Sequence, residues 1–490
     1  MKSDPELVKE GRKTGGWLLT VFLCVLIPAL SFYAPQGYYG LGEEKFRCFK
    51  LLAGVFAFPA LFLLFAVIAV MLRGEHDGKG AAEELRGRMK APDFAALSCA
   101  VLIAVSWCLA ADRGESLWGT SGWRMGALTQ LLMLVIYASA RCFGVRRLPV
   151  ITAAELSSGA VFLFAVLNRY GIYPFSYMSL GGDFLSTIGN IDWYAGYLAV
   201  FLPLWAGDLV RVLLRAKNRI RGRNCVLQVL HVLFLCLGLV LGIWSALTQG
   251  TDSCLLSLGG MAAVLLIAIS GRAGGTFGKA VSAVLTAFIC FLFFLCLLAA
   301  AIHACAESGW GSGVIAWLYY KFSVDFRAGW GNGRGAVWRI AGRLFRDLPF
   351  RRKLFGIGPD GFAAWAMSHP AVADMVSQYF GPLRLTNAHC GLFTALIDEG
   401  ALYAASLAGF YLSFLMGCLR AYSRTEKDNS SAAAPGRRAA ALTGALLLVS
   451  CAAGQMFTFR TVVSEPFLWS FAGILMTEIH SGEEEYDIIK

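Results

Sequence analysis

Residues 225–247 read CVLQVLHVLFLCLGLVLGIWSAL, a run that holds no Asp, Glu, Lys or Arg. A helix rises about 1.5 Å per residue, so a helix of this length reaches about 34 Å and crosses the hydrocarbon core of a bilayer. Inside a bilayer each unpaired backbone group is costly, and a helix pairs all of them within itself. The run is therefore predicted to form a transmembrane helix.

Similar apolar runs follow one another along the chain. They lie near 17–33, 51–72, 93–111, 125–140, 150–167, 193–210, 254–270, 280–304, 389–417, 439–456 and 464–479. The 490 residues are 57% hydrophobic and only 15% charged, whereas a soluble protein carries about a quarter charged residues. The first run leads straight into further runs, so we interpret it as an anchor and expect no cleaved signal peptide. We expect an all-α polytopic membrane protein with about twelve transmembrane helices.

The cationic residues indicate how these helices are oriented. With a cytoplasmic N-terminus, the inside segments hold 26 of the 43 Lys and Arg residues, the short outside loops hold 7, and the long loop 305–388 holds 10. The positive-inside rule then places both termini in the cytoplasm. Basic stretches such as Arg211–Arg223 are interpreted as loops that meet anionic lipid headgroups, and we expect no nucleic-acid binding.

The predicted organisation has four parts. They are nine transmembrane helices in 1–304, a large and mostly helical extracytoplasmic loop in 305–388, three transmembrane helices in 389–479, and a cytoplasmic tail in 480–490. The fourteen cysteines form no CxxC pair and no His/Cys cluster at zinc spacing. We therefore expect no disulfide framework, no metal site and no cofactor.

The long loop 305–388 is the segment where we expect function, because loops of this length are usually functional. It contains ten cationic and five acidic residues, and this excess of positive charge suits an anionic lipid headgroup or a phosphorylated ligand. The pattern of Arg334–Asp347 predicts a helix with one basic face formed by Arg339, Arg343 and Arg346. We interpret that face as solvated or directed at headgroups, while Arg334 and Trp338 lie one turn apart on another face.

Two further features follow the long loop. TNAH, Thr386–His389, brings a histidine to the point where the chain re-enters the membrane. Asp398 and Glu399 then occur within the next apolar run, and intramembrane acids favour either a functional role or an ion-pair role. Other acidic residues in or beside the apolar runs are Glu155, Asp208, Asp252 and Glu465.

The ordered set of motifs resembles the O-antigen ligase-like family of ligases and polysaccharide polymerases. The resemblance runs from about the third span to the C-terminus and rests on GNIDWYAGYLAVFLPL (Gly189–Leu204), NGRGAVW (Asn332–Trp338), FGIGPDGF (Phe355–Phe362), TNAH, and DEG (Asp398–Gly400). One departure is that many members carry a Ser-Arg-Gly-like turn where this chain has Thr251, Asp252 and Ser253. An arginine of the family's phosphate-binding set is therefore absent at that place.

The resemblance implies a metal-independent, inverting glycosyltransferase of the GT-C type in a bacterial cytoplasmic membrane. Its donor would be a glycan on undecaprenyl pyrophosphate, and its acceptor a glycan or glycolipid on the outer face. Arginine suits a pyrophosphate leaving group, and we expect Arg334 first and Arg327 second in that role. His389 matches the family's essential histidine and would abstract the acceptor's proton or position the acceptor.

The remaining site predictions support these residues. Asn387 and Glu399 would orient the histidine or an arginine. Further substrate-binding candidates, drawn from the same motifs and from the departing turn, are Trp338, Asp252, Gly356, Gly358, Asp360 and Asn190.

Two other functions fit the same architecture. A transporter or flippase of lipid-linked glycan would explain the spans and the intramembrane acids, but the predicted spans hold no Lys or Arg and show no internal repeat. A non-catalytic scaffold of an envelope complex would use the long loop as a docking surface, and it would tolerate changes at Arg334 and His389.

Overall fold

The computed structural model describes residues 4–73, 89–180, 186–216, 225–272, 330–382, 384–427 and 434–480. Every regular element within these ranges is a helix. The predicted span 280–304 and the candidate Arg327 lie outside the described residues.

The described residues before 273 form nine α-helices and one short 3₁₀ helix. They are α1 (Asp4–Phe32), α2 (Leu41–Arg73), α4 (Ala91–Leu109), α5 (Arg113–Trp118), α6 (Ala127–Phe143), α7 (Arg147–Arg169), η1 (Ser176–Leu180), α8 (Ile191–Ala216), α9 (Cys225–Gln249) and α10 (Asp252–Arg272). The elements after residue 329 are α13 (Trp330–Asp347), α14 (Phe350–Phe355), α15 (Phe362–Ser368), α16 (Pro370–Phe380), α17 (Gly391–Asp398), α18 (Ala401–Lys427), α19 (Ala434–Gln455) and α20 (Glu465–His480).

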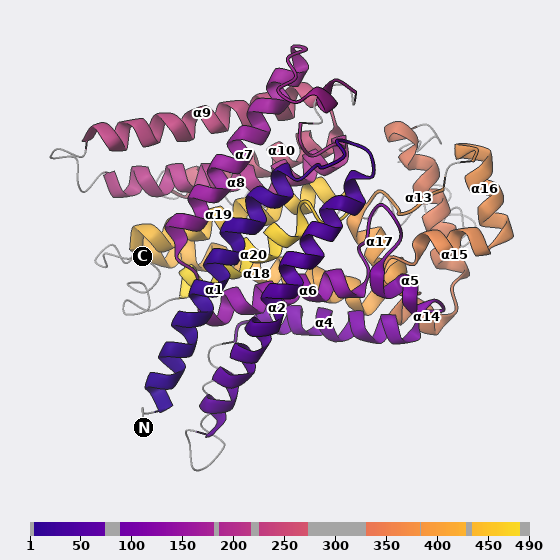
Figure 1. Ribbon diagram of the computed structural model, residues 1–490, viewed down its shortest axis with the longest axis horizontal. Coiled ribbons are helices and arrows are strands. Elements are labelled where there is room, and N and C mark those ends of the chain that lie inside the picture. The colour runs from indigo at the N-terminus through magenta and orange to yellow at the C-terminus, as the bar shows by residue number, and fades with distance from the viewer. Residues whose placement is uncertain are drawn as a thin grey trace.

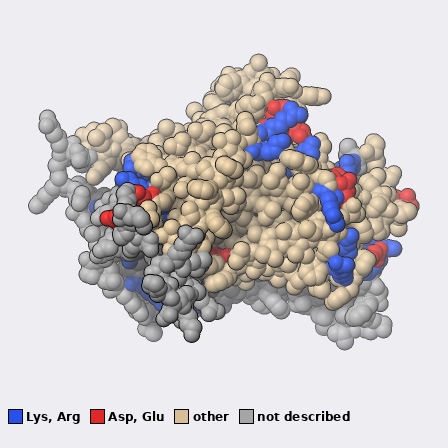
Figure 2. Space-filling model, turned by 60° about the horizontal axis from the view of Figure 1, so that its bottom comes forward, with Lys and Arg blue, Asp and Glu red and all other residues tan. Residues whose placement is uncertain are grey.

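Nine of the helices in the described residues are long and apolar enough to cross a membrane: α1, α2, α4, α7, α8, α9, α10, α18 and α19. Their outer faces carry large apolar side chains. On α2, for example, Phe58, Phe62 and Phe65 are 84%, 71% and 77% exposed, and such a stripe is suited to lipid. Figure 2 shows a broad face almost free of charge, with charged residues mainly toward its ends. The chain is a polytopic membrane protein.

The centre of the bundle is formed by α8 and α19, which pack against each other. α19 also packs against α10, α18 and α20, while α8 packs against α9 (Figure 1). Large side chains such as Tyr197, Phe201 and Trp205 on α8 are fully or almost fully buried. Because α8 is fixed by this core, its first turn can hold side chains in a fixed position at the end of the bundle where α8 begins.

The expected number of twelve spans is not reached by the helices described. α6 and α20 have 17 and 16 residues, which is at or below the lower end of the roughly 17–25 residues that a spanning helix needs. The predicted span 389–417 is wrong as one helix, because α17 ends at Asp398 and α18 begins at Ala401. The break is at Gly400, whose φ of +92° cannot continue a right-handed helix.

A small helical unit, formed by α13, α14, α15 and α16, lies at one end of the molecule (right in Figure 1). It has its own apolar core, in which Val337 and Ile340 of α13 are buried together with Phe362 of α15, Val376 of α16 and Ile397 of α17. The helix predicted for Arg334–Asp347 is confirmed within α13. This unit carries Arg334 against the end of the bundle where α8 and α10 begin.

Candidate functional site

Four ionisable side chains meet where α8 and α10 begin. Arg334 lies between two carboxylates, with Nη2 3.4 Å from Oδ1 of Asp192 and Nη1 3.6 Å from Oδ2 of Asp252. The Nδ1 atom of His389 is 4.0 Å from Oδ2 of the same Asp192. We call Arg334, His389, Asp192 and Asp252 the arginine–histidine cluster. Arg334, His389 and Asp252, which lie far apart in the sequence, were predicted as site residues, and the structure brings them together.

Asp192 is placed by the start of α8. The side-chain Oδ1 of Asn190 accepts hydrogen bonds from the backbone N–H groups of Asp192 (2.9 Å) and Trp193 (3.2 Å). An Asn before a helix pairs N–H groups that the first turn leaves without a helical partner. Asn190, expected to bind substrate, thus acts on its neighbours by fixing the turn that carries Asp192.

His389 sits in a tight turn between α16 and α17. Its φ is +45°, a left-handed conformation that costs free energy for a residue with a side chain. Asn387 holds this turn, since its Oδ1 accepts a hydrogen bond of 2.9 Å from the His389 backbone N–H. The Ala388 N–H donates to Oγ1 of Thr394 on α17 (3.2 Å). Asn387 therefore supports the backbone of the histidine, as expected for a residue that orients it.

The surroundings keep the His389 ring neutral. Burial, and next the positive charge of Arg334, lower the pKa of His389 to about 4 from its ordinary value of 6.5. At neutral pH the ring therefore has one nitrogen with a free lone pair, which can accept a proton. With a neutral His389, the cluster holds two carboxylates and one guanidinium, a net charge of −1.

One edge of the cluster is open. The Arg334 and Asp192 side chains are 11% and 14% exposed, but the Asp252 side chain is 54% exposed. The ion pair between Arg334 and Asp252 is therefore accessible to solvent and long, and such pairs contribute little free energy. An anionic ligand entering from this edge can replace Asp252 as the partner of Arg334.

Aromatic side chains from the loop between α19 and α20 line the cluster. The ring of Phe457 lies 5.9 Å from the Arg334 guanidinium and 5.7 Å from the ring of Trp338. The ring of Phe459 meets the His389 ring edge-on at 5.1 Å. Trp338 thus lines the cluster beside Arg334. The loop of residues 456–464 contacts the cluster in addition to the start of α8 and the turn that holds His389.

The FGIGPDGF segment packs against the break between α17 and α18 and forms backbone hydrogen bonds to it. The N–H groups of Ile357 and Gly358 donate to the carbonyl oxygens of Ile397 (3.2 Å) and Asp398 (2.9 Å). The backbones approach so closely that a Cβ on Gly356 would lie 2.1 Å from the carbonyl oxygen of Asp398. Gly356 and Gly358 therefore pack against the chain itself in this structure.

Asp360 and Glu399 belong to a buried network next to this break. Asp360 accepts hydrogen bonds from the backbone N–H groups of Thr120 (2.6 Å) and Met125 (3.1 Å). Glu399 pairs with Arg460, whose Nη2 is 3.1 Å from Oε2 of the carboxylate. Both acids contact groups other than the arginine–histidine cluster, so their contacts here are structural.

Sequence reasoning missed several residues that build the cluster. Asp192 stands inside a quoted motif, two residues after Asn190 at the start of a predicted span, and this position was its only signal. Phe457, Phe459 and Arg460 lie in a short loop that carried no motif. Neither the models of known protein families nor the curated proteins include a match to this chain.

Proposed function

We propose that this chain is a membrane glycosyltransferase that moves a glycan from undecaprenyl pyrophosphate to a glycan or glycolipid acceptor. The observation that carries the proposal is the contact of Arg334 and His389 with one carboxylate, Asp192, at the end of the bundle. An arginine that can bind phosphate and a neutral histidine that can accept a proton are the two groups that this transfer needs.

The transfer makes one bond and breaks one. The acceptor hydroxyl oxygen attacks the anomeric carbon of the donor, the bond from that carbon to the phosphate oxygen breaks, and undecaprenyl pyrophosphate leaves. Attack from the face opposite the leaving group inverts the anomeric configuration. The hydroxyl proton must go to a base, and the leaving group gains negative charge.

Arg334 is assigned to the leaving group. Its guanidinium is always cationic, and its fork of N–H donors matches phosphate oxygens. Phosphate oxygens entering at the open edge would take the place of Asp252, while the less exposed Asp192 keeps the guanidinium in position. Removal of one such charge-stabilising donor from an enzyme lowers the rate by about 10²–10³-fold.

His389 is assigned to the acceptor hydroxyl. Its Nδ1 faces Asp192, and closure of the 4.0 Å gap would let Nδ1–H donate to that carboxylate. The other ring nitrogen, Nε2, then carries the lone pair that receives the hydroxyl proton. Asp192 orients the histidine and stabilises the imidazolium that forms, so one carboxylate serves both functional residues.

The proposed location of this chemistry is the extracytoplasmic face. The turn before Asp192 and the turn at Asp252 belong to the loops that are poor in Lys and Arg, whereas the cation-rich segments lie at the other ends of the same helices. The positive-inside rule assigns the cation-rich ends to the cytoplasm. The exposed side chains of Leu255 and Leu256, which follow Asp252 on α10, would contact the polyprenyl chain of the donor in the bilayer.

The experiment is transfer in proteoliposomes that contain the purified chain, lipid-linked glycan and an acceptor. Arg334→Gln and His389→Gln should each lower the transfer rate by about 10²–10⁴-fold. The matched control is Arg343→Gln, because Arg343 lies on the same helix and pairs at the surface with Asp347 (2.7 Å). Near wild-type transfer by both cluster variants, with intact size-exclusion profiles, would exclude this mechanism.

A flippase of lipid-linked glycan is the second candidate. It is favoured by charged side chains buried on the spanning helices, such as Lys45 on α2, Asp208 on α8 and Arg211 on α8. A flippase would carry the intact lipid-linked glycan across the proteoliposome membrane and would form no glycosidic bond. Movement without any new bond would therefore replace the first proposal by this one.

A further inference from the structure

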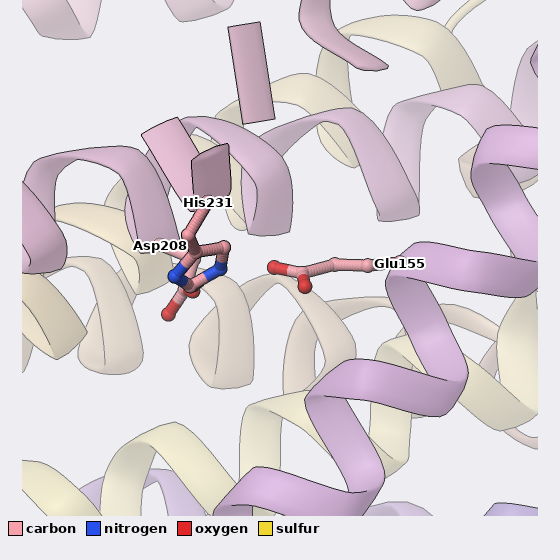
Figure 3. Close-up of side chains that lie close together, drawn as sticks. All are labelled: Glu155, Asp208 and His231. Carbon is pink, nitrogen blue, oxygen red and sulfur yellow. Dashed lines mark ion pairs between the residues drawn. The ribbon is translucent and has the colours of Figure 1, made fainter. Parts of the chain in front are cut away.

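A second cluster of metal-binding residue types lies among the spanning helices. Glu155 on α7, Asp208 on α8 and His231 on α9 each contribute one donor atom, and these atoms all lie within 4.8 Å of one another. Figure 3 shows the Glu155 side chain extending from its helix toward Asp208 and His231. Three separate helices thus converge on one point with one nitrogen and two carboxylate donors.

The second cluster is remote from the arginine–histidine cluster. Asp192 and Asp208 both lie on α8, sixteen residues apart along the helix. At about 1.5 Å per residue, this separation is about 24 Å. The second cluster therefore lies in the C-terminal half of α8, far from the arginine–histidine cluster, and the proposed glycan transfer does not use it.

Among the described residues, the ion pairs around the second cluster do not include Glu155. Arg147 pairs with Asp208 (2.5 Å) and Glu478 (3.2 Å), and Arg211 pairs closely with Glu478. Two guanidiniums thus balance two carboxylates. Glu155 makes no ion pair among the described residues, and its Oε1 is buried and accepts no hydrogen bond.

A carboxyl group buried between spanning helices is either protonated or held beside a cation, because an isolated buried charge is costly. Glu155 is only 5% exposed, and when protonated its carboxyl group can share a hydrogen bond with that of Asp208. A divalent cation at the point where Glu155, Asp208 and His231 converge would displace this proton and bind both carboxylates.

The spacing of the donors suits a small divalent ion. Nε2 of His231 is 3.8 Å from Oδ2 of Asp208, too long for a hydrogen bond. Donors that bind zinc at about 2.0–2.1 Å lie roughly 3.3 Å apart in a tetrahedron, so small side-chain movements would complete the site. One imidazole with two carboxylates is a donor set for Zn²⁺ and related ions.

The neighbouring groups also fit a metal site. Arg147 contacts Oδ1 of Asp208, which leaves Oδ2 directed at His231. A ligating carboxylate is usually held by a hydrogen bond of this kind through its other oxygen. The His231 side chain is 42% exposed, so the protein leaves one side of the site uncovered.

We propose that Glu155, Asp208 and His231 bind one divalent transition-metal ion, with Zn²⁺ as the ion that their chemistry suits best. The ion ties α7, α8 and α9 together at a level of the bundle remote from the arginine–histidine cluster. This inference does not depend on the proposed glycosyltransferase activity.

The test is zinc binding to the full-length chain, purified in detergent and first stripped of metal with a chelator. Wild type should bind one equivalent of Zn²⁺. His231→Gln and Glu155→Gln should each weaken binding by more than about 100-fold, since loss of even an outer-shell partner costs about 10–100-fold. Co²⁺ in place of zinc should give visible absorption bands that both variants lose.

The matched control is His369→Gln, which removes a histidine of the small helical unit. It should keep the full zinc stoichiometry. His231 is half-exposed, so its replacement leaves the fold intact even if Glu155→Gln does not fold. Absence of zinc binding by wild type, or unchanged binding by His231→Gln, would overturn the proposal.

Discussion

Arg460 holds together the loop and the helix break that support the candidate site, and its loss should destabilise the protein. Its Nη1 donates to the hydroxyl of Tyr403 (2.8 Å) and to Oε1 of Gln130 (3.1 Å), while Nη2 binds both oxygens of Glu399. The Arg460 side chain is 8% exposed and that of Glu399 is fully buried. Arg460→Met leaves the Glu399 carboxylate buried without its cation.

The expected loss follows from that uncompensated charge. Removing one partner of a buried ion pair costs about 3–5 kcal/mol, whereas replacing both partners by apolar side chains of similar size costs far less. We therefore expect Arg460→Met to lower the free energy of unfolding by about 3–5 kcal/mol. The double variant Arg460→Met/Glu399→Leu should recover at least half of that loss.

The assay is unfolding by increasing mole fractions of dodecyl sulfate in mixed micelles, followed by tryptophan fluorescence. The single variants and the double variant form a cycle with wild type, from which the coupling free energy is obtained. A loss of less than about 1 kcal/mol for Arg460→Met would show that the ion pair contributes no more than an exposed pair. A larger loss in the double variant than in Arg460→Met alone would show that the uncompensated charge of Glu399 is not the cause.

Three further outcomes follow from the geometry. Burial and Arg334 lower the pKa of His389 to about 4, so the transfer rate should fall with decreasing pH only near pH 4. A fall of the rate already near pH 6.5 would contradict a buried, neutral histidine. Asp252→Asn removes the carboxylate that competes with the donor phosphates for Arg334. Since exposed ion pairs contribute up to about 1 kcal/mol, the KM for the lipid-linked donor should fall up to about 5-fold. A higher KM would show that Asp252 itself binds the donor. Gly400→Ala puts a Cβ 2.4 Å from the Leu354 carbonyl oxygen, at a φ of +92°. The unfolding titration should therefore show a free energy of unfolding lower by about 2–4 kcal/mol. An unchanged free energy of unfolding would place the helix break elsewhere.

Apolar runs alone were sufficient to predict most of the spanning helices. The run 225–247 became α9, which begins at Cys225 as expected and ends at Gln249. A bilayer imposes length and apolarity on each span separately, so the prediction needs no knowledge of neighbouring helices. The break in 389–417 was not predicted, because the conformation of Gly400 depends on its contact with the FGIGPDGF segment.

Contacts between helices set the limit of the prediction for the site. The sequence motifs indicated Arg334 and His389, but Asp192 joins them only because α8, α13 and the His389 turn meet in space. The partner of Glu399 was predicted as an arginine in general terms, and its identity as Arg460 depends on the packing of the loop before α20. Glu155, Asp208 and His231 likewise come from three helices, and no spacing along one chain reveals such a group.

Glycan transfer by this chain is tested by the stoichiometry of products in sealed proteoliposomes. The pyrophosphate-linked polyprenol released and the new glycosidic bonds formed would be counted from the same sample. A glycosyltransferase that uses Arg334 and His389 should release one undecaprenyl pyrophosphate for each new bond, and Arg334→Gln should lower both products together by about 10²–10⁴-fold. Lipid-linked glycan that crosses the membrane intact, with neither product formed, would exclude a glycosyltransferase and favour a flippase.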